Sequence, residues 1–288
     1  MGKRPRAKPR ILWLLALFLL LFLLWVAWSN VAPQLTTHTV ISERLPAAFD
    51  GYRIAHVSDL HNTEIGKENA KLLALLKDAS PNVIAITGDT VDCRRTDVDV
   101  ALAFLGEAVK IAPCFYVTGN HETGIEKKAY ADYEAAMTAL GVTVLHGQAV
   151  TVDRGGASIS LAGIDDPTFN RRYTGGKGPS LTTDGIQGLL PADGFTVLLS
   201  HRPEFFETYV SAGVDLVLTG HVHGGQFRLP FVGGLYGPNQ GILPTYDAGL
   251  YTEGRTNMIV SRGLGNSSFP IRFNNRPNLV LIELACSP

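Results

Sequence analysis

The chain has 288 residues and a formal net charge of −1, from 25 Lys and Arg against 26 Asp and Glu. Five of the basic residues lie within the first ten, so the rest is mildly acidic, which argues against a nucleic-acid partner because such partners require a basic face. The three cysteines, Cys93, Cys114 and Cys286, give no disulfide framework, and buried free thiols are favoured over a pairing of the first two.

The first element in chain order is an apolar helix over residues 11–28, which carry no charge, glycine or proline. Its length of ~27 Å nearly matches the ~30 Å hydrocarbon core of a bilayer. The basic segment 1–10 precedes it, so we expect an uncleaved single-pass anchor in the cell membrane, with the N-terminus cytoplasmic and the rest of the chain extracytoplasmic. A cleaved secretory signal is the alternative, although the run is long and Ala32 gives a poor cleavage site.

Residues 29–36 are expected to be a linker, and residues 37–288 one large α/β domain, with an edge strand at 37–41. Three strand–loop–helix units follow, with strands at 52–58, 82–87 and 114–118 and helices at about 68–79, 97–111 and 127–140. Units of this kind build a mostly parallel sheet that carries helices on its faces.

After Gly141 the pattern changes to short strands at 142–145, 148–152, 158–162, 195–200, 214–219, 258–261 and 279–284, with a helix near 203–212. A second sheet stacked on the first is therefore expected. The predicted fold is a four-layer αββα sandwich of two mixed sheets flanked by helices, preceded by one N-terminal transmembrane helix. The glycine-rich stretches 172–180 and 231–254 are expected to be long surface loops.

Five short polar motifs each follow an apolar strand, and loops at the carboxyl ends of strands form the ligand crevice of α/β sheets. The motifs are Asp59-Leu60-His61, Gly88-Asp89 with Asp92, Gly119-Asn120-His121-Glu122, Ser200-His201 and Gly220-His221-Val222-His223. Residues i and i+2 of an extended chain point to the same side, so Asp59 and His61 are expected to bind one ion together. The glycines are expected to let the backbone turn sharply before the next side chain.

Together the motifs DLH, GDTVD, GNHE, SHRP and GHVHGGQ resemble those of the calcineurin-like metallophosphoesterase superfamily. Within it, the chain is similar to the membrane-associated branch that includes the bacterial YkuE and YaeI phosphodiesterases. The likeness runs from about His38 to Leu284 and includes the late segments RLPFVGGLYGP and SRGLGNSSFPIRFNNRP.

The resemblance implies a centre of two divalent metal ions. It assigns the first ion to Asp59, His61 and His223, the second to Asn120, His201 and His221, and a bridging role to Asp89. It places His121 beside the substrate as the catalytic acid. Asp92 and Glu122 would support the site, with Glu122 orienting His121. Arg94 could contact phosphate, although a solvated surface arginine is the alternative. Arg202, Arg262 and Arg272 carry the same two interpretations.

The implied ligands suit Mn, Fe or Zn better than thiolate-binding metals. Two such ions can clamp an in-line displacement at phosphorus by a metal-bridging hydroxide, while His121 protonates the leaving oxygen. The expected function is a metal-dependent phosphoric ester hydrolase, with a phosphodiester favoured, acting on the outer face of the membrane.

Because of the anchor, a lipid or cell-envelope phosphate is an attractive substrate, and soluble nucleotides remain open. The alternative is a catalytically silent metal-binding module of the cell envelope or of lipids. A metal-independent nucleophilic hydrolase is disfavoured because the sequence lacks a G-x-S-x-G elbow.

Overall fold

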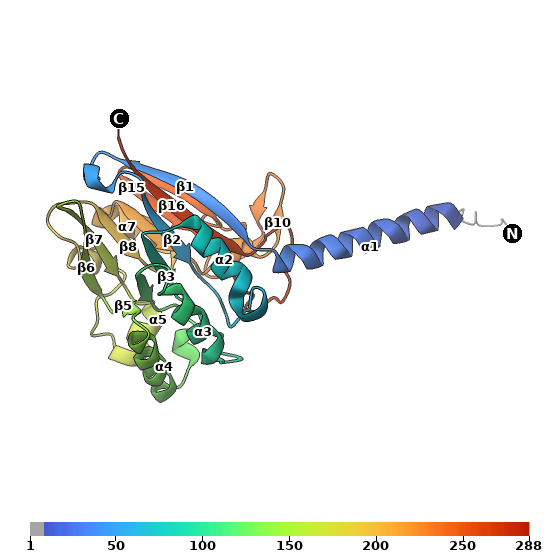
Figure 1. Ribbon diagram of the computed structural model, residues 1–288, viewed down its shortest axis with the longest axis horizontal. Helices are drawn as coiled ribbons and strands as arrows, with labels where there is room; N and C mark the ends of the chain where they lie inside the picture. Colours follow the sequence, from blue (N-terminus) through green and yellow to red (C-terminus); the bar gives the residue numbers. More distant parts are fainter. Residues whose placement is uncertain (1–8, 288) are drawn as a thin grey trace.

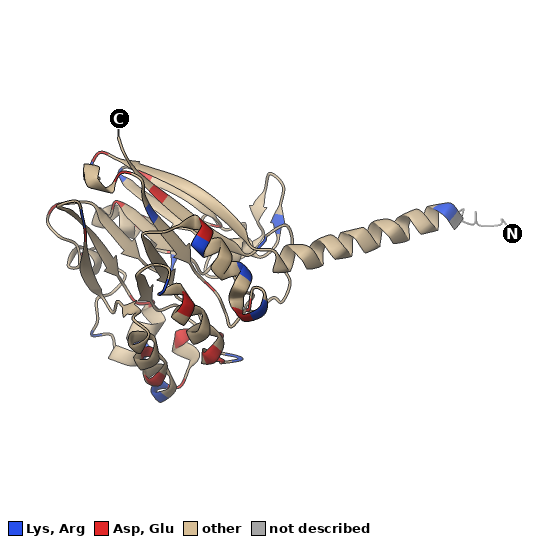
Figure 2. Ribbon diagram, in the orientation of Figure 1, with Lys and Arg blue, Asp and Glu red and all other residues tan. Residues whose placement is uncertain are grey.

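Helix α1 (Pro9–Val31) extends away from the rest of the chain (Figure 1). The computed structural model describes residues 9–287, so most of the basic segment 1–10 lies outside the described residues. Arg10 is the one charged residue on α1, and Figure 2 shows the remainder of the helix without Lys, Arg, Asp or Glu. Among the described residues, α1 alone is long and apolar enough to cross a membrane. It extends three residues beyond the 11–28 segment at its carboxyl end.

The first sheet is six-stranded and mixed, in the order β1-β16-β2-β3-β4-β5. Its strands are β1 (Gln34–Ser42), β16 (Asn278–Cys286), β2 (Tyr52–Val57), β3 (Val83–Thr87), β4 (Cys114–Val117) and β5 (Thr143–Val144). The first and last long strands of the body, β1 and β16, pair in parallel, and β16 runs antiparallel to β2. The remaining pairs are parallel because a helix connects each strand to the next. These helices are α2 (Ala70–Ala79), α3 (Val98–Ala108) and α4 (Lys127–Ala139).

The second sheet is also six-stranded and mixed, in the order β14-β15-β9-β8-β7-β6. Its strands are β14 (Gly249–Glu253), β15 (Thr256–Val260), β9 (Leu216–Thr219), β8 (Thr196–Leu199), β7 (Ala157–Gly163) and β6 (Gln148–Arg154). Helices α6 (Thr183–Gln187) and α7 (Phe206–Ala212) pack on its outer face through an apolar cluster that includes Ile186, Phe206 and Tyr209.

Alternate residues of the central strands belong to different apolar cores. On β3, Ile84 and Ile86 pack with the cluster that contains the helices α2 to α4, whereas Val83 and Ala85 pack with residues of the second sheet. This period of two is what a strand buried on both faces requires. The result is helix, sheet, sheet and helix in four layers, which confirms the predicted fold class (Figure 1).

The glycine-rich stretches contain more regular structure than expected. Residues 249–253 form the edge strand β14, which pairs antiparallel with β15, so the expected loop 231–254 is wrong at this end. The rest of that stretch holds two small antiparallel ladders, formed by β10 (Arg228–Leu229) with β11 (Gly233–Gly234) and β12 (Tyr236–Gly237) with β13 (Gly241–Ile242). The sequence does not indicate β14 because none of its five residues is buried, so the strand lacks the apolar run that marks the central strands.

Several short helices complete the chain. Helix α5 (Pro167–Phe169) continues into a π-helical turn (Asn170–Thr174), so the expected loop 172–180 begins inside a helical turn. Single 3-10 turns lie at Ala47–Phe49, Lys67–Asn69, Glu122–Gly124, Pro203–Phe205 and His223–Gly225. Cys93, Cys114 and Cys286 are free thiols, as favoured by the sequence, and only Cys114 is fully buried.

Candidate metal centre

Both sheets direct the carboxyl ends of strands toward one buried location. From the first sheet, the loops after β2, β3 and β4 carry Asp59, His61, Asp89, Asn120 and His121. From the second sheet, the loops after β8 and β9 carry His201, His221 and His223. All except Asn120, which is half-buried, are buried side chains. The structure therefore brings together all seven residues that the resemblance assigned to metal.

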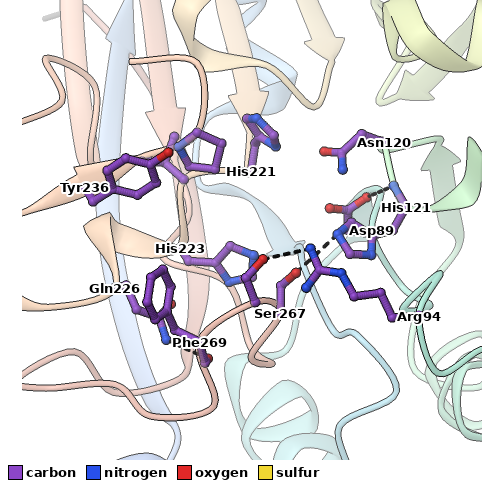
Figure 3. Close-up of a pocket in the computed structure, with 13 residues that line it drawn as sticks. Asp89, Arg94, Asn120, His121, His221, His223, Gln226, Tyr236, Ser267 and Phe269 are labelled. Atoms are coloured by element: carbon purple, nitrogen blue, oxygen red, sulfur yellow. Dashed lines mark hydrogen bonds between the residues drawn. The ribbon is translucent and has the colours of Figure 1, made fainter. Parts of the chain in front are cut away.

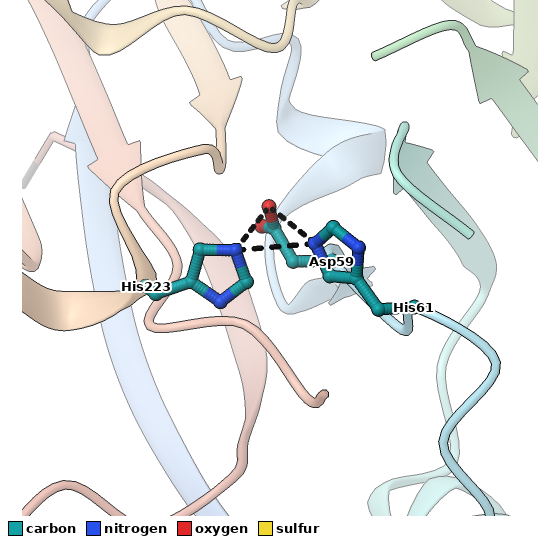
Figure 4. Close-up of side chains that lie close together, drawn as sticks. All are labelled: Asp59, His61 and His223. Atoms are coloured by element: carbon teal, nitrogen blue, oxygen red, sulfur yellow. Dashed lines mark hydrogen bonds and ion pairs between the residues drawn. The ribbon is translucent and has the colours of Figure 1, made fainter. Parts of the chain in front are cut away.

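One group of these side chains consists of Asp59, His61 and His223 (Figure 4). The Nε2 atoms of the two imidazoles lie 3.1 Å apart, and they lie 3.8 and 3.5 Å from Asp59 Oδ1. Two ligand atoms that each lie ~2.1 Å from one cation, at ~90–110° to each other, are ~3.0–3.4 Å apart. The spacing of the two imidazole nitrogens therefore fits a shared cation.

A second group consists of Asp89, His201 and His221. The Nε2 atom of His201 lies 3.2 Å from Asp89 Oδ2 and 3.2 Å from Asn120 Oδ1. The same Asp89 oxygen lies 3.6 Å from His61 Nε2, which belongs to the first group. Asp89 therefore lies between the two groups, where one carboxylate can serve both.

The charges of these groups suit a cation. Burial alone would raise the pKa values of Asp59 and Asp89, but the facing histidines hold both carboxyls below their ordinary range. Burial lowers the pKa of His223 to about 3 and that of His221 well below its ordinary value, so both rings are neutral at pH 7. Neutral imidazole is the form that binds metal.

His201 behaves in the opposite way. Burial opposes its protonation, but Asp89 outweighs this effect and raises the pKa of His201 to about 10. Protonated His201 would therefore pair with Asp89 through the contact between Nε2 and Oδ2, and a divalent cation could replace this proton between the two ligands. Among the ion pairs of residues 9–287, Asp59 and Asp89 pair only with histidines. Two buried carboxylates that lack a Lys or Arg partner, set among imidazoles, fit divalent cations.

Two buried arginines hold the imidazole rings. Arg202 Nη1 donates to His221 Nε2 at 2.8 Å, and Arg272 Nη2 lies 3.3 Å from His223 Nδ1. Because guanidinium only donates, the contacted nitrogen is unprotonated and the other nitrogen carries the proton of the neutral ring. The sequence left both arginines between a site and a surface role, and the structure places them at the site.

The backbone at the candidate ligands is strained. Asp59, His61, Asp89, His221 and His223 all have φ between 47° and 70°. This region is uncommon for residues other than glycine, and it occurs mainly where function requires it. The expectation that i and i+2 residues converge because the chain is extended is therefore wrong. Asp59 and His61 meet because the chain turns through left-handed residues.

Two of the three motif glycines serve close approach rather than turning. A Cβ atom on Gly220 would lie 1.8 Å from Ser58 Oγ and 2.4 Å from Asp59 Oδ2, and one on Gly119 would lie 2.3 Å from Asp89 Oδ1. Only Gly88 has a left-handed φ, of 82°. The absence of a side chain at Gly119 and Gly220 therefore lets the loops from different strands touch the carboxylates.

His121 lies next to the first group, with its ring 4.5 Å from that of His61. The amide of Cys93 donates to His121 Nδ1 at 3.2 Å, and Asp92 Oδ1 lies 3.6 Å from the same nitrogen. Burial lowers the pKa of His121, so the ring is neutral at pH 7 and its single proton lies on Nε2. That nitrogen is 3.2 Å from Ser267 Oγ and faces the pocket.

Glu122 has contacts that differ from the expectation. Its carboxylate accepts hydrogen bonds from the amides of Asp89, Thr90 and Gly119, at 2.8–3.0 Å, and not from His121. Glu122 therefore fixes the loop that presents Asp89, because a carboxylate can satisfy several buried amide donors at once. The orientation of His121 depends instead on the segment that contains Asp92 and Cys93.

A pocket opens over the two groups (Figure 3). It is lined by Asp89, Arg94, Asn120, His121, His221, Val222, His223, Gln226, Tyr236, Pro238, Ser267, Ser268 and Phe269. Arg94 Nη2 donates to Ser268 Oγ at 2.8 Å, which holds the guanidinium at the pocket. The lining residues Tyr236, Pro238, Ser267, Ser268 and Phe269 lie in the late segments that carry the family resemblance, but no role at the site was predicted for them.

Residues 52–225, more than half of the chain, match the model of the calcineurin-like phosphoesterase family. The chain belongs to this family. It is therefore a metal-dependent phosphoric ester hydrolase of the calcineurin-like type, and the groups around Asp59 and Asp89 are its candidate metal-binding residues.

The phosphoesterase has curated relatives over most of its length. It is 32% identical to the metallophosphoesterase YkuE of Bacillus subtilis, covering 87% of this chain and 85% of YkuE. It is 28% identical to the phosphodiesterase YaeI of Escherichia coli, covering 81% and 82%. It is 30% identical to a bovine transmembrane protein with a metallophosphoesterase domain, of which it spans 58%. These relatives confirm the membrane-associated branch.

Among solved structures, the sulfate thiohydrolase SoxB of Thermus thermophilus aligns with 84% of this chain and 57% of its own, with a TM-score of 0.53. The sequence identity is 14%, so this likeness concerns the fold alone.

Proposed function

We propose that the chain hydrolyses a phosphodiester at a centre of two divalent cations, held by the Asp59 and Asp89 groups. The observation that carries this proposal is the position of Asp89, whose Oδ2 atom lies 3.2 Å from His201 and 3.6 Å from His61. Asp59, His61 and His223 would hold one cation, and Asn120, His201 and His221 the other. Ligands of this kind suit Mn, Fe or Zn.

The cations would supply Lewis acidity and a water molecule of lowered pKa. The protein would supply the proton for the leaving oxygen. In the neutral ring of His121 the proton lies on Nε2, because Nδ1 accepts from the amide of Cys93, and Nε2 faces the pocket. His121 can therefore donate to an ester oxygen bound beside the Asp89 group. Arg94, held by Ser268, can bind a phosphate oxygen that the cations leave free.

The pocket favours a diester over a monoester. Its polar base of histidines and Asp89 is flanked by Tyr236 and Phe269, which can contact a second ester substituent. Helix α1 would anchor the domain of residues 37–288, and the basic residues before α1 would keep the N-terminus cytoplasmic. A lipid or cell-envelope phosphate outside the membrane is therefore the proposed substrate class. YaeI is named a phosphodiesterase, which agrees with the choice of a diester over a monoester.

The test is an activity panel on the full-length protein in detergent, with bis(p-nitrophenyl) phosphate and p-nitrophenyl phosphate under Mn, Zn, Fe and Mg. We expect faster turnover of the diester. Asp89→Ala should abolish activity and lower the bound metal measured by mass spectrometry. His121→Ala should keep its metal and lose roughly 10²–10⁴-fold in kcat, the usual contribution of general acid catalysis.

A matched control is His38→Ala, which removes an imidazole on β1 outside the candidate groups. It should retain both metal and activity. Full activity of metal-free Asp89→Ala protein would overturn the metal mechanism. Stoichiometric metal without turnover of either ester would favour the alternative of a silent metal-binding module.

A further inference from the structure

We propose that the loops beside the pocket, at residues 227–232 and 269–273, are seated in the bilayer that α1 crosses, so that the pocket opens at the lipid surface. We call these residues the docking loops. One consequence of this position concerns the substrate, which would be a phosphate ester whose apolar tail stays in the membrane. This consequence rests on the proposed function. The position of the docking loops themselves can be tested without turnover.

Contacts between α1 and the body set the depth of the docking loops. The ring of Phe273 packs against Trp25, with centroids 5.6 Å apart, and against Phe22, at 6.0 Å. These helix residues lie three and six positions before Trp28, the last residue of the apolar run 11–28, so at ~1.5 Å per residue they are ~5–9 Å below it. If the apolar run occupies the hydrocarbon core, Phe273 lies at the same depth in the bilayer as Phe22 and Trp25, which it contacts.

The backbone of the deepest segment is suited to an apolar medium, which tolerates no unpaired amide or carbonyl group. The side chain of Asn30 accepts from the Arg272 amide at 2.7 Å and donates to the Arg272 carbonyl at 2.9 Å. The Phe273 amide donates to Gln226 and its carbonyl accepts from Arg228, at 3.4 and 3.0 Å. The main chain at residues 272 and 273 is therefore fully paired inside the protein.

Aromatic side chains continue from Phe273 to the pocket. Phe273 pairs with Phe227 through an isolated parallel bridge, and the Phe227 ring lies 6.3 Å from that of Phe269, which lines the pocket. Phe227 and Phe269 are 36% and 50% exposed, and Ile271 is 51% exposed. An apolar path therefore connects the membrane helix to the pocket, along which an acyl chain could lie.

The tip of the β10–β11 hairpin extends this apolar surface. It lies on the side of the body from which α1 emerges (Figure 1). Phe231 is fully exposed, with a left-handed φ of 67°, and Leu229 and Val232 are 40% and 55% exposed. A contiguous exposed apolar patch marks an interaction site, and a bilayer is the partner already present beside α1. Arg276, stacked on Trp28 at 4.8 Å, lies where lipid phosphates would be.

The position of the docking loops can be tested by photo-crosslinking in nanodiscs of dioleoylphosphatidylcholine. The full-length protein would carry p-benzoylphenylalanine at position 231, and a control would carry it at position 41. Ile41 is 58% exposed but lies near the far end of β1 from α1. We expect phospholipid adducts at 231 and none above background at 41. Equal yields at both positions, or adducts at 231 only to a second copy of the chain, would overturn the proposal.

Activity tests the consequence for the substrate. Phe231→Asp/Val232→Asp protein would be compared with Ile41→Asp on a phosphatidyl p-nitrophenol ester in the same nanodiscs and on soluble bis(p-nitrophenyl) phosphate. We expect the hairpin variant to lose about tenfold or more in rate on the embedded ester only, since each buried charge at the interface opposes docking. An equal loss on both esters would contradict the inference. If wild-type protein crosslinks to lipid but hydrolyses neither ester, docking stands and the proposed function fails.

Discussion

At the scale of single residues, the candidate centre depends on its glycines as much as on its ligands, because no side chain fits at those positions. Gly119 and Gly220 leave room for Asp89 and Asp59, and five of the seven candidate ligands adopt left-handed backbone angles. Each such residue costs ~1–3 kcal/mol, so the surrounding fold must hold the loops in place. Bound cations would offset part of this cost.

Gly220→Ala should therefore destroy the first candidate ion site. The new Cβ atom would overlap Ser58 Oγ and Asp59 Oδ2, so the loop after β9 would have to move away from Asp59. We expect loss of at least half of the bound metal and of nearly all activity, measured by mass spectrometry and ester hydrolysis. Gly106→Ala is the control, because a Cβ there meets only Leu140 at 3.5 Å. Normal metal content in Gly220→Ala would contradict the assignment.

His146 gives a residue-scale prediction for pH. Burial opposes its charge, but hydrogen bonds to Asp165 and Glu134 prevail and raise its pKa from 6.5 to about 10. The contacts of protonated His146 therefore stabilise the fold fully below pH 6.5, and this stabilisation is lost as the pH rises through about 10. His146→Gln should thus lower the melting temperature most at pH 6 and least near pH 10. A difference that stays constant over this range would contradict the prediction.

At the scale of elements, the junction between α1 and the body connects the membrane to the candidate centre. Asn30 on the last turn of α1 bonds both backbone groups of Arg272, and the buried side chain of Arg272 reaches His223. The same guanidinium donates to the Arg262 carbonyl at 2.6 Å. Strand β1, which follows α1 in the chain, pairs with β16 in the first sheet. The membrane helix is therefore connected to the sheet that carries Asp59 and Asp89 as well as to His223.

Asn30→Leu should loosen this connection while keeping the helix. Two hydrogen bonds of ~0.5–1.5 kcal/mol each are lost, so the melting temperature of the full-length protein should fall by roughly 2–8 °C. Differential scanning fluorimetry in detergent measures this shift. Val31→Ala, an exposed neighbour on the same turn, is the control. If Asn30→Leu melts like the control, the junction does not contribute to stability.

At the scale of the whole molecule, the two sheets each supply part of the candidate centre. The first sheet consists of strands within residues 34–144 and the last strand β16, and the second consists of strands within residues 148–260. The first sheet supplies both carboxylates and the second supplies His201, His221 and His223. Cations bound between them would connect the sheets in addition to their shared apolar core.

Removal of metal should therefore destabilise the entire fold. A cation at 100 times its dissociation constant stabilises the native state by ~2.7 kcal/mol. Addition of a chelator such as EDTA should lower the melting temperature of the wild-type protein by several degrees, and added Mn or Zn should restore it. Asp89→Ala should show no such response. An unchanged melting temperature of the wild-type protein after complete metal removal would contradict the structural role of the cations.

The architecture and the set of candidate ligands can be predicted from the amino-acid sequence alone. Apolar runs with a period of two, alternating with helical segments, specify the two sheets, and the motifs after them carry the Asp, Asn and His side chains in order. These features are local, because strand, turn and helix preferences depend on residues close in the chain. The helix α1 is equally local, since its apolar composition and length are evident from residues 11–28 alone.

The contacts between those parts could be found only in the folded structure. It assigned Glu122 to the Asp89 loop, gave His146 two carboxylate partners, and placed Arg272 against His223. It also placed Phe273 against α1 and connected Phe273 through Phe227 to Phe269 at the pocket, contacts that no local pattern in the sequence indicates. Such contacts link residues far apart in the chain, and they depend on the packing of side chains across loops, which no local pattern records.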